Sequence, residues 1–213
     1  MTELELAGHP ALLVRPRGAK ALYVLAHGAG AGMRHPFMAA IADSLATHAI
    51  ATLRWEFPYM AVGKARPDAA PVAEAAVRSL WNAAGKRFRA LPRFAGGKSF
   101  GGRMTSRAHA AEPLADLRGI AFLGFPLHPP EKPGIERAEH LAQARGPLLF
   151  LQGTRDDLAD LALLRPVIAE LGARAKLHII DGANHAFEVR GRKHNDVIAE
   201  LARAIAEWIE AVL

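Results

Sequence analysis

The sequence contains no cysteine, and it has no apolar run of membrane-spanning length. The absence of cysteine excludes disulfide bonds, a thiol nucleophile and a cysteine-ligated metal together. The N-terminal residues 1–5 alternate between acidic and other side chains, unlike the basic and apolar segments of a signal peptide. We therefore expect a cytoplasmic protein that has no membrane partner.

Positive charge exceeds negative charge, which gives a net charge of +6 and a pI of about 10.1. The lysines and arginines are spread along the chain without a dense cluster or interleaved aromatic residues. This pattern is typical of a solvated surface, so we expect no nucleic-acid partner. A group of basic residues near the loops described below would nevertheless attract an anionic small molecule. They are Arg34, Lys98, Arg103 and Arg155.

Apolar runs with strand character alternate with helical patterns along the chain, without repeats or low-complexity segments. This alternation predicts an α/β fold in which a mostly parallel sheet is covered by helices on both faces. The length of 213 residues suits a single domain, residues 1–213. The expected strands are 3–6 and 11–14, which form an antiparallel hairpin, and 22–26, 49–55, 93–98, 119–125, 147–152 and 175–180. The expected helices are 36–48, 70–89, 103–112, 160–171 and 194–212.

Two of these helices have clear apolar faces at helical spacing. The residues expected to face the core are Phe37, Ile41 and Leu45 in the first helix and Val72, Ala76, Leu80 and Trp81 in the second. Two long proline-rich connections, 54–71 and 125–134, follow strands. They are expected at the carboxyl edge of the sheet, where open α/β sheets bind ligands.

A serine lies between two glycines in the segment 97–101, GKSFG, at an expected strand-to-helix turn. This is the G-x-S-x-G pattern of a nucleophile elbow, in which the glycines allow close approach of neighbouring backbone. A phosphate-binding loop is the competing interpretation of Gly96 to Ser99, but it needs a further glycine at the position occupied by Pro92. Ser99 is therefore a candidate nucleophile.

The glycine-rich stretch from His27 to Gly32 follows the expected strand 22–26 directly. Backbone N–H groups in such a loop converge on an oxyanion. In an elbow of this kind the second donor is the N–H of the residue after the nucleophile. We therefore predict an oxyanion hole formed by the N–H groups of Ala29 and Phe100.

Two further candidates follow the last two expected strands. The segment 151–157, LQGTRDD, offers Asp156 three residues past Gly153, with Asp157 as the close alternative or as the cap of the next helix. His185 lies in a loop of small residues after the strand 175–180. The chain order Ser99, Asp156, His185 is the order of an α/β-hydrolase triad.

Several other polar residues near these loops are weaker candidates for the substrate pocket: His27, Gly28, Arg34, Glu56, Lys98 and His128. Glu56 is expected to form a structural ion pair with Arg54 or Lys64, because charged groups near buried strands are usually paired. His128 is more typical of an ordinary loop residue, and Lys98 of a side chain that points to solvent. No H-E-x-x-H or similar spacing exists, so we expect no metal and no cofactor.

Four segments together resemble the α/β-hydrolase superfamily, and the similarity extends over essentially the whole chain. They are RWEFPY at 54–59, GKSFGGR at 97–103, FPLHPP at 125–130 and LQGTRD at 151–156. The chain is most similar to small dienelactone-hydrolase-like predicted hydrolases that have no lid domain. It also resembles the hydrolase-like domain of a subunit of a non-specific-lethal histone acetyltransferase complex. Dienelactone hydrolase itself has a cysteine nucleophile, whereas this chain has Ser99.

The resemblance implies a three-layer fold with an eight-stranded, mostly parallel sheet in which one strand is antiparallel. Only residues 126–146 occupy the place of a lid, so an open, shallow site partly covered by residues 60–71 is expected. The resulting hypothesis is a serine hydrolase that acts on a small-molecule acyl ester or thioester. The alternative is a non-catalytic binding or scaffold module with the same fold. A homodimer is compatible with the sequence.

Overall fold

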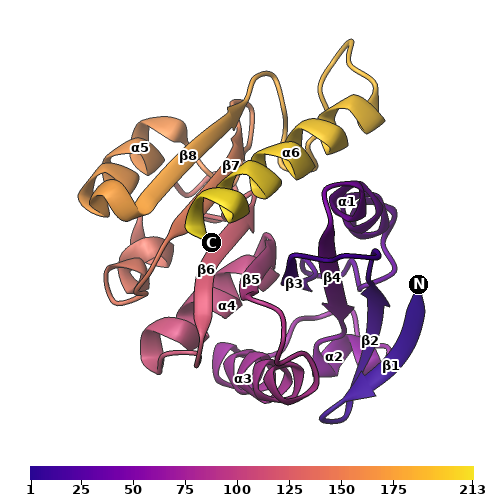
Figure 1. Ribbon diagram of the computed structural model, residues 1–213. Helices are drawn as coiled ribbons and strands as arrows, with labels where there is room; N and C mark the ends of the chain where they lie inside the picture. The colour runs from indigo at the N-terminus through magenta and orange to yellow at the C-terminus, as the bar shows by residue number, and fades with distance from the viewer.

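The computed structural model describes residues 1–213, which form one eight-stranded sheet with helices on both faces (Figure 1). The strands are β1 (Thr2–Leu6), β2 (His9–Val14), β3 (Ala21–Ala26), β4 (Ile50–Trp55), β5 (Arg93–Lys98), β6 (Leu117–Leu123), β7 (Leu148–Gly153) and β8 (Ala175–Ile180). The helices are α1 (Pro36–Thr47), α2 (Pro58–Ala61), α3 (Ala70–Arg87), α4 (Phe100–Ala111), α5 (Leu161–Glu170) and α6 (His194–Val212). Short 3-10 helices are η1 (Glu136–Ala142) and η2 (Gly172–Arg174). No helix combines the length and apolar character needed to cross a membrane.

The strand order is β1-β2-β4-β3-β5-β6-β7-β8. The strand β2 pairs antiparallel with both β1 and β4, and all other pairs are parallel, so β2 alone runs against the rest. The expected hairpin and the single antiparallel strand are thus confirmed. Ala26 pairs with both Trp55 and Gly97, so β3, β4 and β5 end at almost the same level of the sheet. The segments that follow these three strands therefore start side by side.

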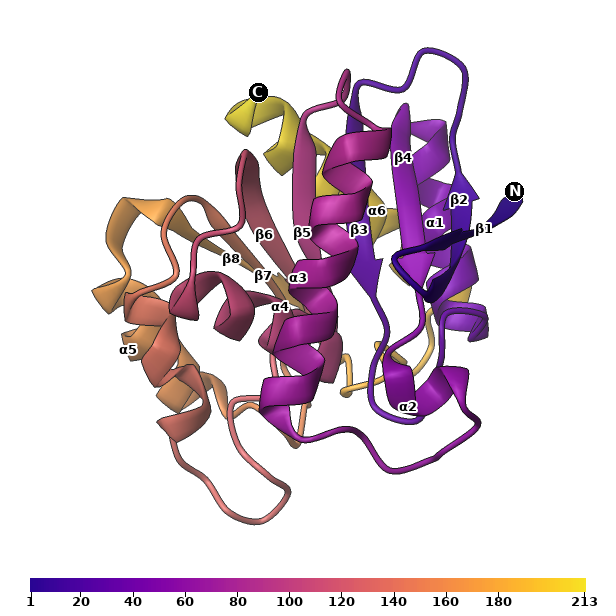
Figure 2. The same cartoon turned by 90° about the horizontal axis from the view of Figure 1, so that it is seen from below.

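The core consists of two apolar layers, one on each face of the sheet. The helices α1 and α6 pack on one face, against a cluster that includes Tyr23, Phe94 and Leu151. The helices α3 and α4 pack on the other face around Trp55 and Trp81, and α5 and η1 extend that layer. Figure 2 shows α3 and α4 in front of the sheet and α6 behind it. This is the three-layer α/β-hydrolase arrangement, without a lid.

The structure differs from the expected elements in three places. The helix α4 begins at Phe100, directly after Ser99, rather than at 103. The short helices α2 and η1 lie inside stretches expected to be loops. Val72 is 48% exposed, because the inward face of α3 consists of Ala73 and the residues that follow it at helical spacing. The remaining residues expected to face the core in α1 and α3 are buried.

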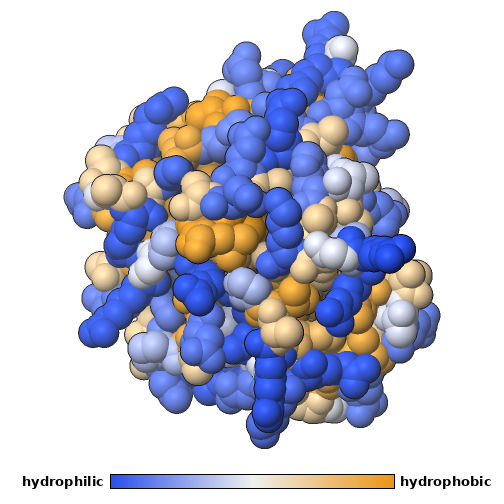
Figure 3. All heavy atoms as spheres, in the orientation of Figure 1, coloured by the Kyte–Doolittle hydropathy of each residue, from blue (hydrophilic) through white to orange (hydrophobic).

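The connections after β4 and β6 both lie at the carboxyl edge of the sheet, which is at the bottom of Figure 2. The surface in Figure 3 is mostly hydrophilic, with apolar residues in separate patches. The functional candidates are therefore to be sought at the carboxyl edge, where six parallel strands present their following loops.

Candidate active site

Ser99 occupies the sharp turn between β5 and α4 and has the strained dihedral angles φ 47° and ψ −114°. The neighbouring glycines permit this turn. A Cβ atom on Gly97 would overlap the carbonyl oxygen of Ala26, and one on Gly101 would overlap that of His27. Because both obstacles are backbone atoms of the adjacent strand and loop, no side chain can be accommodated at either position. The expected elbow geometry is present at Ser99.

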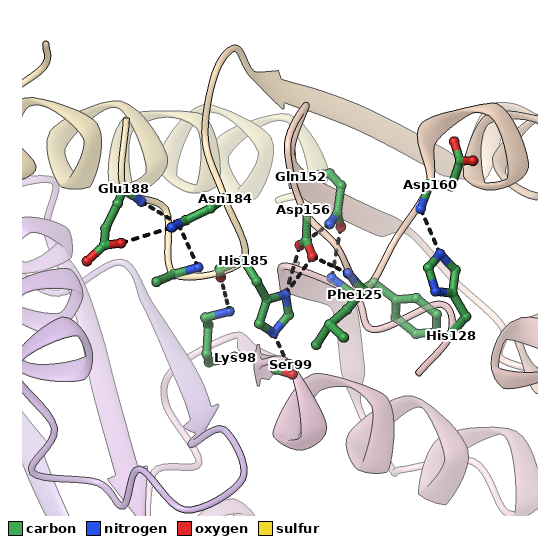
Figure 4. Close-up of polar contacts among 12 residues, drawn as sticks. Lys98, Ser99, Phe125, His128, Gln152, Asp156, Asp160, Asn184, His185 and Glu188 are labelled. Atoms are coloured by element: carbon green, nitrogen blue, oxygen red, sulfur yellow. Dashed lines mark hydrogen bonds and ion pairs between the residues drawn. The ribbon is translucent and has the colours of Figure 1, made fainter. Parts of the chain in front are cut away.

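A continuous hydrogen-bonded chain joins Ser99, His185 and Asp156 (Figure 4). The Ser99 Oγ atom lies 2.9 Å from His185 Nε2. The His185 Nδ1 atom lies 2.9 and 2.8 Å from the two carboxylate oxygens of Asp156. A carboxylate accepts hydrogen bonds, so Nδ1 carries a proton and Nε2 is left to accept the serine proton. This arrangement can activate a hydroxyl group as a nucleophile.

The carboxylate of Asp156 is fixed by groups that sequence inspection missed. Gln152, at the end of β7, donates through Nε2 to Asp156 Oδ2 at 2.5 Å and accepts the Phe125 N–H at 2.9 Å. The N–H of Leu158 donates to the other carboxylate oxygen at 2.9 Å. The only sequence feature that could have indicated this role of Gln152 is its position inside a strand, directly before Gly153.

Asp157, the close alternative, is exposed and does not contact His185. It does not cap the next helix either, because the N-cap of α5 is Asp160, whose side chain accepts the Ala162 N–H at 2.8 Å. Asp156 and Asp157 therefore differ clearly in their surroundings. Only Asp156 is buried and directed at the imidazole.

The loop that carries His185 is shaped by Asn184, whose side-chain oxygen accepts the N–H groups of Ala186 and Glu188. Lys98 holds the same loop from the other side, because its Nζ donates to the carbonyl oxygen of His185 at 2.6 Å. Lys98 therefore points into the site rather than to solvent. Burial lowers the pKa of Lys98 to about 8, and the nearby charge of Asp156 opposes this effect.

A cavity of about 720 Å³ opens directly beside Ser99 and His185. Its apolar wall includes Phe37 and Met38 at the start of α1 and Leu158 after β7. Gly28, Ala29, Lys98 and Arg155 also line it. None of the residues 60–71 lines the cavity, so the expected partial cover by that segment is wrong.

Four of the weaker pocket candidates lie outside the cavity. His27 is the fully buried first residue of the glycine-rich loop, residues 27–33, and it contacts Glu56. The expected ion pair of Glu56 with Arg54 or Lys64 is therefore wrong. Arg34 is exposed and pairs with Glu3 at 2.8 Å. His128 joins two loop segments, since its Nε2 accepts the Asp160 N–H at 3.0 Å. Each of these polar groups is directed to a partner other than the cavity.

The candidate oxyanion donors come from the glycine-rich loop and from the start of α4. The N–H of Ala29 makes no hydrogen bond within the protein, and Ala29 lines the cavity. Phe100 is the first residue of α4, so its N–H belongs to the helical turn that has no acceptor of its own. The N-terminus of α4 also favours a negative charge at this point.

The match to known proteins agrees with this geometry. The family described as "Alpha/beta hydrolase domain" matches residues 19–210. A dienelactone hydrolase from Anabaena variabilis has a similar structure, with a TM-score of 0.79 and 20% identity over 99% of this chain and 95% of that one. A serine hydrolase without a lid from Xanthomonas campestris matches with a TM-score of 0.77 and 17% identity over 97% and 94% of the two chains.

Est1E from Butyrivibrio proteoclasticus is also similar, with a TM-score of 0.73 and 15% identity over 99% of this chain and 98% of that one. At such identities the structural matches establish the fold, and the family match supports a hydrolase in general terms. The chain belongs to the alpha/beta hydrolase family, and its fold is similar to that of a dienelactone hydrolase and of a serine hydrolase without a lid.

Proposed function

We propose that this protein is a serine hydrolase that cleaves small acyl esters or thioesters through an acyl-enzyme. The observation that carries the proposal is the unbroken chain of hydrogen bonds from Ser99 through His185 to Asp156 at the wall of an open cavity. An unreactive serine in a turn needs neither a strained backbone nor a buried carboxylate behind an imidazole.

In the first half of the reaction, Ser99 Oγ attacks the carbonyl carbon of the substrate while His185 Nε2 takes the hydroxyl proton. The N–H groups of Ala29 and Phe100 stabilise the resulting oxyanion. When the tetrahedral intermediate collapses, the bond to the leaving oxygen or sulfur breaks and His185 donates its proton to that atom. Asp156 stays ionised and stabilises the imidazolium that forms in between.

In the second half, water replaces the leaving group. His185 removes a proton from the water as it attacks the acyl carbon, and the oxyanion forms again in the same place. Collapse then breaks the bond to Ser99 Oγ, which recovers its proton from His185. The acid is released and the enzyme returns to its starting state. The apolar wall at Phe37, Met38 and Leu158 supports a small uncharged acyl group as the part that is bound.

The test compares the wild type with Ser99→Ala on short p-nitrophenyl esters. Ser99→Ala is expected to fold normally and to lose turnover by several orders of magnitude, since the residual rate comes from binding and the oxyanion hole alone. Circular dichroism and thermal melting check the fold. Hydrolysis at a wild-type rate in this variant would refute the proposal.

A fluorophosphonate probe separates the enzyme from a binding module of the same fold. The proposed hydrolase is labelled at Ser99, and mass spectrometry locates the adduct. A folded wild-type protein that is never labelled would instead support the non-catalytic alternative.

A further inference from the structure

The segment 54–59 lies under the glycine-rich loop but contributes no residue to the cavity wall. It runs from the last two residues of β4 into the start of α2 and includes Glu56 and Tyr59, to which the proposed reaction assigns no task. Arg54, Trp55, Phe57 and Tyr59 are at most 2% exposed. A buried segment with several charged and polar side chains needs partners, and most of these partners belong to the glycine-rich loop.

Met33, the last residue of that loop, is held through both of its peptide groups. Glu56 Oε1 accepts the Met33 N–H at 2.9 Å. Arg54 Nη1 donates to the Met33 carbonyl oxygen at 3.1 Å. Both are charge-assisted hydrogen bonds in a largely water-excluded place, which makes them stronger than ordinary ones. The C-terminal end of the loop is therefore fixed.

The middle of the loop is held by Tyr59 and by close packing. The Tyr59 hydroxyl oxygen accepts the Gly30 N–H at 3.1 Å. Gly32 has φ +69°, and a Cβ atom there would lie 3.2 Å from Glu56 Oε1 and 3.1 Å from Met60 Cε. The loop backbone thus rests closely on the segment, and a side chain at position 32 would require Glu56 or Met60 to shift by a few tenths of an ångström.

The start of the loop is held by His27. Its Nδ1 lies 2.8 Å from the Gly28 carbonyl oxygen, which can only accept, so Nδ1 is the donor. Its Nε2 accepts the Phe57 N–H at 3.2 Å and lies 3.1 Å from Glu56 Oε2. Glu56 therefore contacts both ends of the loop, at His27 and at Met33.

The charge of Glu56 is maintained in this position. Burial alone would raise its pKa, but the contact with the His27 ring and the hydrogen bond from the Met33 N–H outweigh burial, and the pKa lies below its ordinary value. Glu56 is consequently ionised at neutral pH, and its carboxylate accepts the hydrogen bond from the Met33 N–H of the loop.

We propose that Glu56 and Tyr59 are positioning residues that hold the glycine-rich loop so that the Ala29 N–H is directed at the developing oxyanion. This inference rests on the proposed function. Neither side chain touches the reacting atoms, and both act through the backbone between Gly28 and Met33. The loop contains several glycines and would otherwise be free to turn its N–H groups away from Ser99.

The test uses Glu56→Ala, Glu56→Gln and Tyr59→Phe with a neutral p-nitrophenyl ester. Glu56→Ala is expected to lower kcat by roughly ten- to a hundredfold with little change in KM, because a misplaced donor weakens only transition-state stabilisation. Glu56→Gln is expected to stay within about threefold of the wild type, since the amide oxygen still accepts from Met33 and the amide N–H faces His27 Nε2, which is an acceptor. Tyr59→Phe, which removes one acceptor, is expected to lower kcat by about three- to tenfold.

His109→Ala is the matched control for a merely structural loss. His109 is also a buried residue that joins two backbone segments, through the Leu114 N–H and the Arg145 carbonyl oxygen, each at 3.0 Å. It lies near the other end of α4. Thermal melting shows how far each variant is destabilised, and kinetics are measured well below every melting temperature. The inference is overturned if Glu56→Ala keeps kcat within twofold, if Glu56→Gln falls as far as Glu56→Ala, or if His109→Ala loses as much.

A second readout does not depend on catalysis. Amide hydrogen exchange in residues 28–33 is expected to be at least about tenfold faster in Glu56→Ala, because the Met33 N–H loses its acceptor. It is expected to be unchanged in Glu56→Gln and in His109→Ala. Equal exchange in all four proteins would overturn the inference. Absence of esterase activity in the wild type, by contrast, would overturn the proposed function and leave this readout as the measure of Glu56.

Discussion

Lys98 Nζ donates a 2.6 Å hydrogen bond to the carbonyl oxygen of His185, so the residue before the serine turn holds the loop that carries the imidazole (Figure 4). The same ammonium lies 5.3 Å from the ring centroid of Phe187, in cation–π contact. The end of β5 and the loop after β8 are thereby joined across the sheet edge. The position of His185 relative to Ser99 therefore depends on this hydrogen bond as well as on the hydrogen bond between His185 and Ser99 themselves.

Replacing Lys98 by methionine tests that dependence. Lys98→Met keeps the length of the side chain and removes the donor, so the His185 carbonyl loses its partner. A small displacement of the imidazole is expected to lower kcat for a neutral ester by about tenfold. Steady-state kinetics at pH 7 measure the effect. A variant with wild-type kcat would show that the loop keeps its position without Lys98.

Lys98 should also contribute a pH dependence to stability. Its pKa is about 8 in the folded protein and 10.5 in its ordinary, unfolded state, because burial disfavours the charged form. Between these values the unfolded chain binds more protons, so this contribution to the free energy of unfolding rises as pH increases from about 8 toward 10.5. The rise should be present in the wild type and absent from Lys98→Met. Urea denaturation at intervals from pH 7.5 to about 9.5 measures the difference, and parallel curves for both proteins would contradict it.

Asp156 and Asp157 offer a matched pair for the proposed triad. In Asp156→Asn the new amide can donate to His185 Nδ1 and so favours the tautomer that cannot accept the Ser99 proton. A loss in kcat of roughly 10³- to 10⁴-fold is expected. Asp157→Asn removes the same charge at an exposed neighbour that does not contact His185, and it should stay within about threefold. Similar losses in the two variants would point to general electrostatics instead of a specific contact.

His140 should make the protein sensitive to acid. Its Nε2 lies 2.7 Å from Ser106 Oγ, where η1 packs on α4. Burial, aided by the charges of Arg107 and Arg103, lowers the pKa of His140 to about 4. The unfolded chain binds more protons between about pH 6.5 and 4, so stability falls as pH drops through this window. The fall should be smaller in His140→Gln than in the wild type, whereas His48→Gln, at an exposed position, should behave as the wild type.

Arg155 is the basic residue of the cavity wall whose guanidinium makes no hydrogen bond or ion pair within the protein. An ester that carries a carboxylate would therefore gain from Arg155 a contact that a neutral ester cannot make. Arg155→Gln is expected to raise KM for the anionic ester by about three- to tenfold and to leave a neutral ester of equal chain length unchanged. Equal effects on both esters would exclude recognition of the charge.

Local patterns were enough for most of the elements and for a mostly parallel sheet covered by helices on both faces. The strands are short apolar runs, the helices have apolar residues at helical spacing, and both signals depend on neighbours in the sequence. The elbow was also readable, since Gly97 and Gly101 are needed wherever a serine turn packs against adjacent backbone. Val72 shows the limit of this approach: a shift of one residue in the face of α3 depends on what the helix packs against.

The hydrogen-bond partners of polar side chains could not be predicted from local sequence patterns. Gln152, Lys98 and Glu56 each make their decisive contact with a residue more than three positions away, and two of them do so across the sheet edge. The expectation that Glu56 pairs with Arg54 or Lys64 looked along the chain, whereas its partners are on the preceding loop.

The sequence by itself determined the order of strands and helices along the chain, the turn at Ser99 and two side chains of the proposed triad, Ser99 and His185, because each of these is specified by residue type and local spacing. Only the tertiary structure decided that Asp156 and not Asp157 meets His185, and that Lys98 turns inward. It also decided that the segment 54–59 supports the glycine-rich loop from below. These outcomes follow from the register of parallel strands, which brings residues far apart in the chain to one edge of the sheet.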